Sequence, residues 1–250
     1  MIKSVAKALD LLELLAQAQG AQTLSSLAGQ SGQNVNTVKG LLNTLMDKGY
    51  VRQEGSRGGY RLGERVLYLA EAMGFETTLK QLAYPYLEKL HELSGQEAVY
   101  CSVVTGQQYA CLEYIDSGHE LGIRPGNSFL INGNLHIYAQ GKLILAELDE
   151  KELSKYLSQN PLIAKTPGSI TDPRALQEQL ETVAKTGLAI VKDECTVGIS
   201  SLAAGIRNQT GKLVATIAVA FPSSRLPRDH ETNIGIKLVA FANEISKKLS

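Results

Sequence analysis

Polar side chains that could read base pairs recur along residues 35–48, a stretch with the apolar spacing of an amphipathic helix. Asn36, Lys39 and Asn43 fall on one face of that helix, because side chains three and four residues apart share a face. An asparagine amide can form two hydrogen bonds with an adenine edge, and a lysine can reach guanine or a phosphate. This face therefore predicts contact with the major groove of DNA, although the exposed face of a small helical bundle would carry similar residues.

The segments around this helix have the order of a winged helix-turn-helix. A short apolar-patterned segment at 24–28 comes first, Gly32 interrupts the pattern, and two expected strands at 50–54 and 60–62 flank a glycine-rich turn. Helix, turn, helix and hairpin in this order favour the DNA-binding interpretation over the bundle. Further candidate DNA contacts are polar residues around the two helices and in the wing: Ser25, Ser26, Asn34, Thr37, Arg57 and Arg61.

Another helix is expected over residues 4–19, ahead of the helix-turn-helix. Its apolar residues recur every three or four positions and predict a face that packs behind the DNA-binding helices: Val5, Ala8, Leu9, Leu12, Leu15 and Ala16. Leu11 and Leu14 lie off that stripe. These two leucines either widen the same core face or contact another subunit.

Nucleophilic chemistry was the competing interpretation of the polar residues, and its strongest candidate is Cys195, which follows Asp193 and Glu194. None of the four histidines has a spacing that makes it a partner of this cysteine, and residues 141–142 lack the remaining glycine and hydroxyl residues of a phosphate-binding loop. The three cysteines form no metal-ligand pattern, so neither a metal nor another cofactor is predicted. We therefore predict a protein that is not an enzyme, with a Cys195-dependent redox sensor or enzyme as the lesser alternative.

Composition and charge are ordinary for a soluble globular protein, with 44% hydrophobic and 20% charged residues among 250. No apolar run approaches the roughly 18 residues of a membrane span. Asp10 and Glu13 interrupt the apolar segment that a signal peptide would need, so a cytoplasmic location without membrane contact is expected. The net charge is zero, but residues 24–62 hold five Lys/Arg against two Asp/Glu, a weak basic bias where DNA contact is predicted.

The chain beyond residue 76 mixes hairpin and helix patterns, which indicates an α+β domain with helices against an antiparallel sheet. A short helix around residues 66–73 would connect it to the first domain. Strands are expected at 98–104, 109–115, 121–123, 188–191, 202–207 and 213–221. Helices are expected at 79–93, with a proline inside, and at 138–147, 151–157, 173–185 and 230–249.

In order and spacing, these segments resemble the IclR family of bacterial transcriptional regulators. The matching motifs lie at 5–12 (VAKALDLL), 27–28, 36–42 (NTVKGLL), 49–51 (GYV), 60–63 (YRLG), 135–136, 140–146 (QGKLILA), 185–189, 193–198 and 202–206. The resemblance implies a winged helix-turn-helix domain at 1–62, a linker helix at 63–76, and a GAF-like effector-binding and oligomerisation domain at 77–250. It also implies a homodimer or homotetramer on operator DNA, controlled by a small-molecule effector.

The resemblance further implies where the effector would bind: Ala139, Gln140, Ile199, Ser201, Ala218 and Ala220. Family members that bind small carboxylates tend to have hydroxyl or thiol groups on the strand that here holds residues 218 and 220, and an extra acid near position 191. Here Ala218, Ala220 and Val191 are apolar, which favours a less polar ligand or none.

The recognition helix also departs from the family pattern, because Gly40 stands where an arginine or histidine is usual. A ligand-binding or interaction module with weak or lost DNA binding is therefore the alternative function.

Overall fold

A computed structural model describes residues 2–18, 20–55, 58–66, 69, 74–123, 130–229 and 231–249. The chain forms two compact units, residues 1–74 and 75–250. Arg57, six positions of the expected linker helix (67, 68 and 70–73) and residues 124–129 lie outside the described residues.

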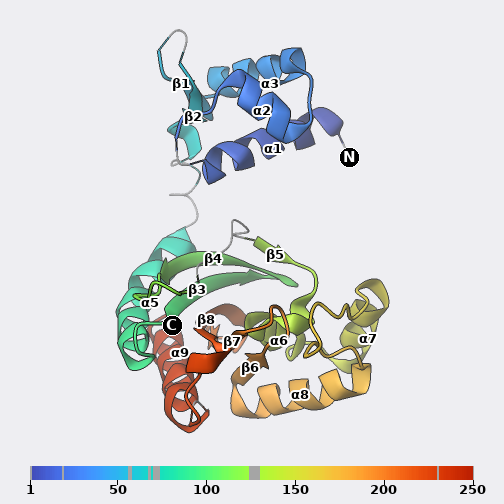
Figure 1. The fold of residues 1–250 in the computed structure, drawn as a ribbon, viewed down its shortest axis with the longest axis vertical. Coiled ribbons are helices and arrows are strands. Elements are labelled where there is room, and N and C mark those ends of the chain that lie inside the picture. Colours follow the sequence, from blue (N-terminus) through green and yellow to red (C-terminus); the bar gives the residue numbers. More distant parts are fainter. Residues whose placement is uncertain are drawn as a thin grey trace. The chain divides into compact units, whose positions relative to one another are not determined.

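The described elements of the first unit include three packed helices and a short hairpin (Figure 1): α1 (Lys3–Gln17), α2 (Leu24–Ser31), α3 (Val35–Asp47), β1 (Val51–Gln53) and β2 (Tyr60–Leu62). Two polar side chains cap α2 and α3 at their N-termini: the Thr23 hydroxyl accepts a bond from the Ser26 amide, and the side-chain oxygen of Asn34 accepts one from the Asn36 amide. Gly32 ends α2 with a φ of 63°, a left-handed conformation that glycine adopts without a steric cost.

Helix α1 packs on α2 and α3 through part of the predicted stripe and through the residues beside it. Leu15 and Leu12 of the stripe join the core, and Leu11, predicted to lie off the stripe, is fully buried and so widens the core face. The prediction was wrong for Val5 and Leu9, which are each 53% exposed. Apolar residues lie around much of the circumference of α1, so their spacing alone does not fix which edge is covered. Val5 and Leu9 therefore form an apolar strip of α1 that the described residues of this unit leave uncovered.

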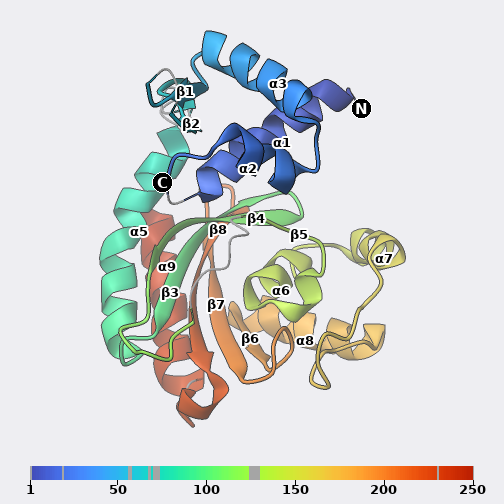
Figure 2. The same ribbon diagram turned by 45° about the horizontal axis from the view of Figure 1, so that its top comes forward.

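The second unit is a six-stranded antiparallel sheet between two layers of helices (Figures 1 and 2). The strands are β3 (Ala98–Thr105), β4 (Gln108–Ile115), β5 (Leu130–Asn132), β6 (Leu188–Lys192), β7 (Ile199–Arg207) and β8 (Leu213–Pro222), in the order β5-β4-β3-β8-β7-β6. The helices are α5 (Gly74–Leu93), α6 (Ala139–Leu145), α7 (Glu150–Gln159), α8 (Pro173–Thr186) and α9 (Ile236–Lys248), with short turns of helix at Leu135–Ile137, Ser223–Arg225 and Glu231–Gly235.

Each face of the sheet has its own hydrophobic core. Helices α5 and α9 cover one face, where Ile217, Val219 and Phe221 of β8 are buried, and α6 and α8 cover the other (Figure 2). Ala218 lies between these large residues in sequence and faces α6, because successive side chains of a strand point to opposite faces. The α+β class, with an N-terminal helix-turn-helix and a C-terminal antiparallel sheet, is confirmed.

One local prediction was wrong. Residues 121–123 form no strand, and β4 pairs instead with β5, where Ile131 lies opposite Tyr109. The expected helix with a proline inside is α5, which continues through Pro85 to Leu93. In the part of the chain that the structure describes, no helix is long and apolar enough to cross a membrane.

Two helical glycines have opposite steric surroundings and give a matched test of the packing. A Cβ added at Gly141, in α6, would lie 2.7 Å from the Leu135 Cα and collide with the Leu135 carbonyl. A Cβ at Gly40, in α3, would meet nothing within 4 Å. We expect Gly141→Ala to lower the free energy of unfolding by about 1–3 kcal/mol, and Gly40→Ala to raise it by about 0.5–1 kcal/mol.

Denaturant unfolding of the full chain, with hydrogen exchange to assign each transition to its unit, measures both effects. A Gly141→Ala protein as stable as the wild type would show that α6 can move away from the Leu135 turn.

Candidate DNA-binding face and effector cavity

Helix α3 presents one polar face to solvent. Asn36, Thr37, Lys39 and Asn43 are all exposed, while Val38 on the opposite side is fully buried in the core of the unit. The structure therefore places these four predicted DNA contacts together on one accessible helix surface. Such a surface has the width and polarity of a helix that enters the major groove.

Several other predicted DNA contacts are engaged within the unit. The Ser26 hydroxyl donates to the Gln22 side chain and accepts from Gln30, and the exposed Ser25 hydroxyl lies 3.1 Å from that of Thr23. The Asn34 side chain caps α3. These groups can still meet a phosphate, but each would share its hydrogen bonds with the fold.

The wing is held by ion pairs between its strands and their neighbours. Arg61 on β2 pairs with Glu54, and Arg52 on β1 lies 3.8 Å from Glu64. Arg61, which was predicted to contact DNA, thus has a carboxylate partner within the unit, and all four side chains are more than two-fifths exposed. Exposed pairs of this kind are weak, so DNA phosphates can compete for the arginines.

Gly40 provides no side chain in the middle of the α3 polar face. The position is exposed, and the Thr44 hydroxyl donates to the Gly40 carbonyl at 3.1 Å. The face therefore offers side-chain contacts on either side of Gly40 but only backbone at that point.

The six predicted effector-contacting residues line one cavity of about 410 Å³ in the second unit. Three elements supply them in pairs: Ala139 and Gln140 from the start of α6, Ile199 and Ser201 from β7, and Ala218 and Ala220 from β8. These residues are up to 81 positions apart in sequence, and the antiparallel sheet brings them to one place. The cavity has the size of a site for a small molecule.

Gln140 is held in a fixed orientation at the cavity wall. Its amide nitrogen donates to the Ser102 hydroxyl at 2.7 Å and to the Thr216 hydroxyl at 2.9 Å. Both amide hydrogens are therefore used by the fold, and the carbonyl oxygen is the part of this side chain that can accept a bond from a ligand.

The remaining wall includes aromatic and thiol residues that sequence reasoning did not select. Tyr109 and Tyr138 meet edge to face with ring centroids 6.4 Å apart. Burial raises the pKa of Tyr138 to about 12 and that of Cys111 to about 11, so both stay neutral at physiological pH. The alternation of the two expected strands could have placed Tyr100 and Tyr109 on the same face as Ser102, but not that this face borders a cavity.

No charged side chain is found among the described residues that line the cavity. Cys195 lies in its wall, whereas the described histidines are bonded elsewhere: His91 to the Glu97 carbonyl, His119 to the Gly95 carbonyl and His136 to the Ile163 carbonyl. The arrangement can bind a molecule of mixed polarity. Within the described chain it gives Cys195 no histidine as a base.

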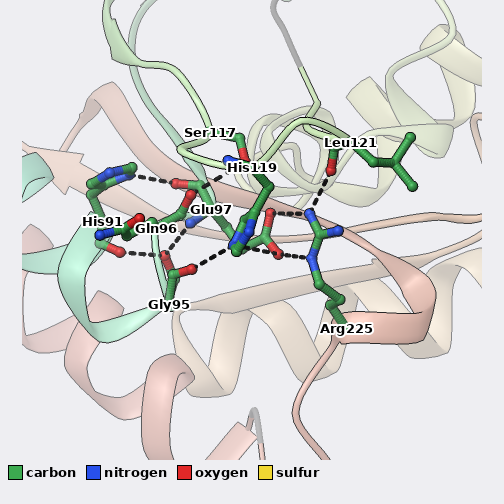
Figure 3. Close-up of polar contacts among 9 residues, drawn as sticks. His91, Gly95, Gln96, Glu97, Ser117, His119, Leu121 and Arg225 are labelled. Carbon is green, nitrogen blue, oxygen red and sulfur yellow. Dashed lines mark hydrogen bonds and ion pairs between the residues drawn. The ribbon is translucent and has the colours of Figure 1, made fainter.

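A buried carboxylate fixes the chain segment that leads into the cavity wall at Ile123 (Figure 3). Figure 3 shows the Glu97 side chain and Arg225 pointing toward each other, with Arg225 Nη2 3.0 Å from Glu97 Oε2 and 2.7 Å from the Leu121 carbonyl. Glu97 is only 2% exposed, and His119 Nε2 lies 3.9 Å from its carboxylate. This cluster ties the turn after α5 to residues 117–121 and to the end of β8.

Comparison with known proteins assigns both units. Residues 4–55 match the IclR helix-turn-helix domain, and residues 75–247 match the C-terminal domain of the bacterial transcriptional regulator IclR. The transcriptional repressor IclR of Escherichia coli K12 is 29% identical over 249 residues, which cover 98% of this chain and 89% of that protein.

Solved structures share the whole fold. The Thermotoga maritima IclR structure superposes with a TM-score of 0.77 at 24% identity, covering 100% of this chain and 99% of that one. An IclR homologue from Microbacterium hydrocarbonoxydans, solved in complex with 4-hydroxybenzoate, gives a TM-score of 0.79 at 22% identity over 98% of both chains. With a family match over more than half of its length, this chain belongs to the IclR family of bacterial transcriptional regulators.

Proposed function

We propose that this protein is a repressor that binds operator DNA through the first unit and releases or retains it in response to a small molecule in the second. The observation that carries the proposal is the pairing of an exposed polar face on α3 with a separate cavity whose wall contains all six expected effector contacts. The name of the Escherichia coli relative supports repression as the sense of the response. Proteins of the IclR family are transcriptional regulators, which argues against a catalytic function for this protein.

The proposed DNA contacts divide by chemistry. Asn36, Lys39 and Asn43 would read base edges, because their side chains are exposed. The remaining predicted residues would contact phosphates and fix the register on the duplex: Ser25, Ser26, Asn34, Thr37, Arg57 and Arg61. Weak or lost DNA binding stays the alternative because of Gly40, which removes one side chain from the reading face.

We expect Lys39→Ala to weaken binding to the DNA upstream of the protein's own gene by roughly 5- to 150-fold. If Lys39 contacts a phosphate, the slope of log affinity against log salt should also fall by about 0.9. Electrophoretic mobility shift or fluorescence anisotropy at several salt concentrations measures both quantities. Lys155→Ala removes an exposed lysine of α7 and serves as the control. Equal affinity of both variants and the wild type would rule out this reading face.

The uncovered strip of α1 supports a homodimer as the DNA-binding form. Leu9 is 53% exposed and borders a groove of about 460 Å³ that Leu12, Leu45, Tyr50 and Leu62 also line. The walls of this groove are almost wholly apolar, with Glu13 as the charged exception. A second copy is the occupant we propose, since two helix-turn-helix heads on one operator require two copies held together.

We expect Leu9→Glu to convert the protein to a smaller species in sedimentation velocity and to weaken operator binding by at least tenfold. The reason is that a carboxylate cannot be buried in an apolar interface without a partner. Ile163→Glu changes an equally exposed residue of the second unit, 51% against 53%, and should leave both properties as in the wild type. An unchanged oligomeric state for Leu9→Glu would exclude this face from the interface.

The cavity supports a small, partly apolar effector. Aromatic rings and aliphatic side chains form most of its wall, and Gln140 and Ser201 offer polar contacts. The relative that holds 4-hydroxybenzoate supports a ligand of comparable size. Ala139, Gln140, Ile199, Ser201, Ala218 and Ala220 would contact it.

A metabolite that binds the folded protein should raise its Tm through linkage, by an amount that grows with concentration. Ala218→Leu fills part of the cavity, because Ala218 is only 4% exposed and faces it, and we expect it to abolish that shift. Ala175→Leu, at an exposed position of α8, is the matched control and should keep the shift. If no member of a broad metabolite panel shifts the wild type, the effector part of the proposal fails.

A further inference from the structure

Two walls of the cavity are joined beneath its surface by one buried ion pair. Lys142 Nζ lies 2.6 Å from Glu194 Oε1 and 2.7 Å from Oε2, and the two side chains are 0% and 6% exposed. Lys142 belongs to α6, two residues after Gln140 in the first wall. Glu194 immediately precedes Cys195 and Thr196, which form the second.

The backbone of the second wall is anchored from another side. The Ser169 hydroxyl donates to the Glu194 carbonyl at 2.6 Å, and the Thr166 hydroxyl donates to the Asp193 carbonyl. Asp193 itself has a left-handed φ of 57°, and its carboxylate accepts bonds from the Gly198 amide and the Ser223 hydroxyl. These bonds fix the course of residues 193–198, and the Glu194 side chain reaches across to Lys142 in the middle of α6.

A contribution to folding stability does not explain the buried Lys142–Glu194 ion pair. Removing a lysine and a carboxylate from water is costly, and apolar residues of similar volume often serve as well or better. Burial lowers the pKa of Lys142 and raises the pKa of Glu194, while the charge of each partner opposes the shift. Apolar contacts are not directional, whereas two short charge-assisted hydrogen bonds from Lys142 to both carboxylate oxygens of Glu194 restrain the separation of the two segments.

We propose that Lys142 and Glu194 are positioning residues that set the distance between the α6 wall and the 195–199 wall of the effector cavity. This inference rests on the proposed effector site, whose shape the pair would determine. It assigns the pair no contact with the ligand. Its consequence is that the cavity can be loosened without unfolding the sheet.

The test compares Glu194→Gln, Lys142→Met and the double variant Lys142→Met/Glu194→Met. Each single change leaves an unpaired buried polar group and should lower Tm by roughly 10 °C. The double change removes both charges and should recover most of that loss. The position of the 195–199 wall is followed through the accessibility of Cys195. The quantity measured is the rate at which N-ethylmaleimide alkylates Cys195 in the full-length protein, determined by peptide mass spectrometry.

We expect Cys195 in the double variant to react at least fivefold faster than in the wild type, with faster hydrogen exchange confined to residues 193–199. Burial raises the pKa of Cys101 and Cys111 to about 12 and about 11, so these thiols react slowly and leave Cys195 as the reporter. Any metabolite that shifts the wild-type Tm should lose at least tenfold in affinity for the double variant.

Leu238→Ala is the control for general loosening, since it removes a fully buried side chain of α9 on the other face of the sheet. A Cys195 rate that rises equally in Leu238→Ala would overturn the proposal, as would a wild-type rate in the double variant. If no metabolite binds the wild type, the effector proposal fails, and the alkylation and exchange rates still decide whether the pair positions the walls.

Discussion

The second unit depends on the two-residue alternation of its central strand. Along β8, Ile217, Val219 and Phe221 fill the core under α5 and α9, whereas Ala218 points the opposite way. Its partners across the sheet are Tyr100 on β3 and Ala203 on β7. One face of each strand thus holds the fold together with large side chains. The other face carries two alanines side by side, Ala203 and Ala218, and Ala218 lines the cavity.

In the first unit, local hydrogen bonds divide the polar residues into those that form the fold and those that remain available. Asn34 and Asn36 are two residues apart, yet the first caps α3 and the second is exposed on its face. Arg61 has a carboxylate partner in Glu54, while Lys39 is exposed on the polar face of α3. Helix capping therefore narrows the set of side chains that are free to read bases.

Most of the fold could be predicted from the sequence, because the order of the short motifs and the spacing of apolar residues are local signals. The errors arose where a distant group decides the outcome. Residues 121–123 read as a strand, but Arg225 holds the Leu121 carbonyl from more than a hundred residues away. In α1, apolar residues on several sides left the buried edge undetermined until α2 and α3 were placed.

The candidate site was only partly within reach of sequence reasoning. The six cavity residues were selected from the family resemblance, but Tyr109 and Tyr138 were not, because periodicity gives the face of a strand and not the shape of the space beside it. The burial of Lys142 was even harder to predict from the sequence. Lysines are almost never fully buried without a partner, and Glu194 lies 52 positions away, so nothing near Lys142 in sequence indicates its burial.

Gly40 bears on how such a protein can acquire a new operator. At Gly40 nothing lies within 4 Å of a new side chain, and glycine is already the second-worst residue for a helix interior. Almost any substitution there would change what the helix presents to DNA while leaving its packing intact, so operator preference can drift at this position at little risk to the fold.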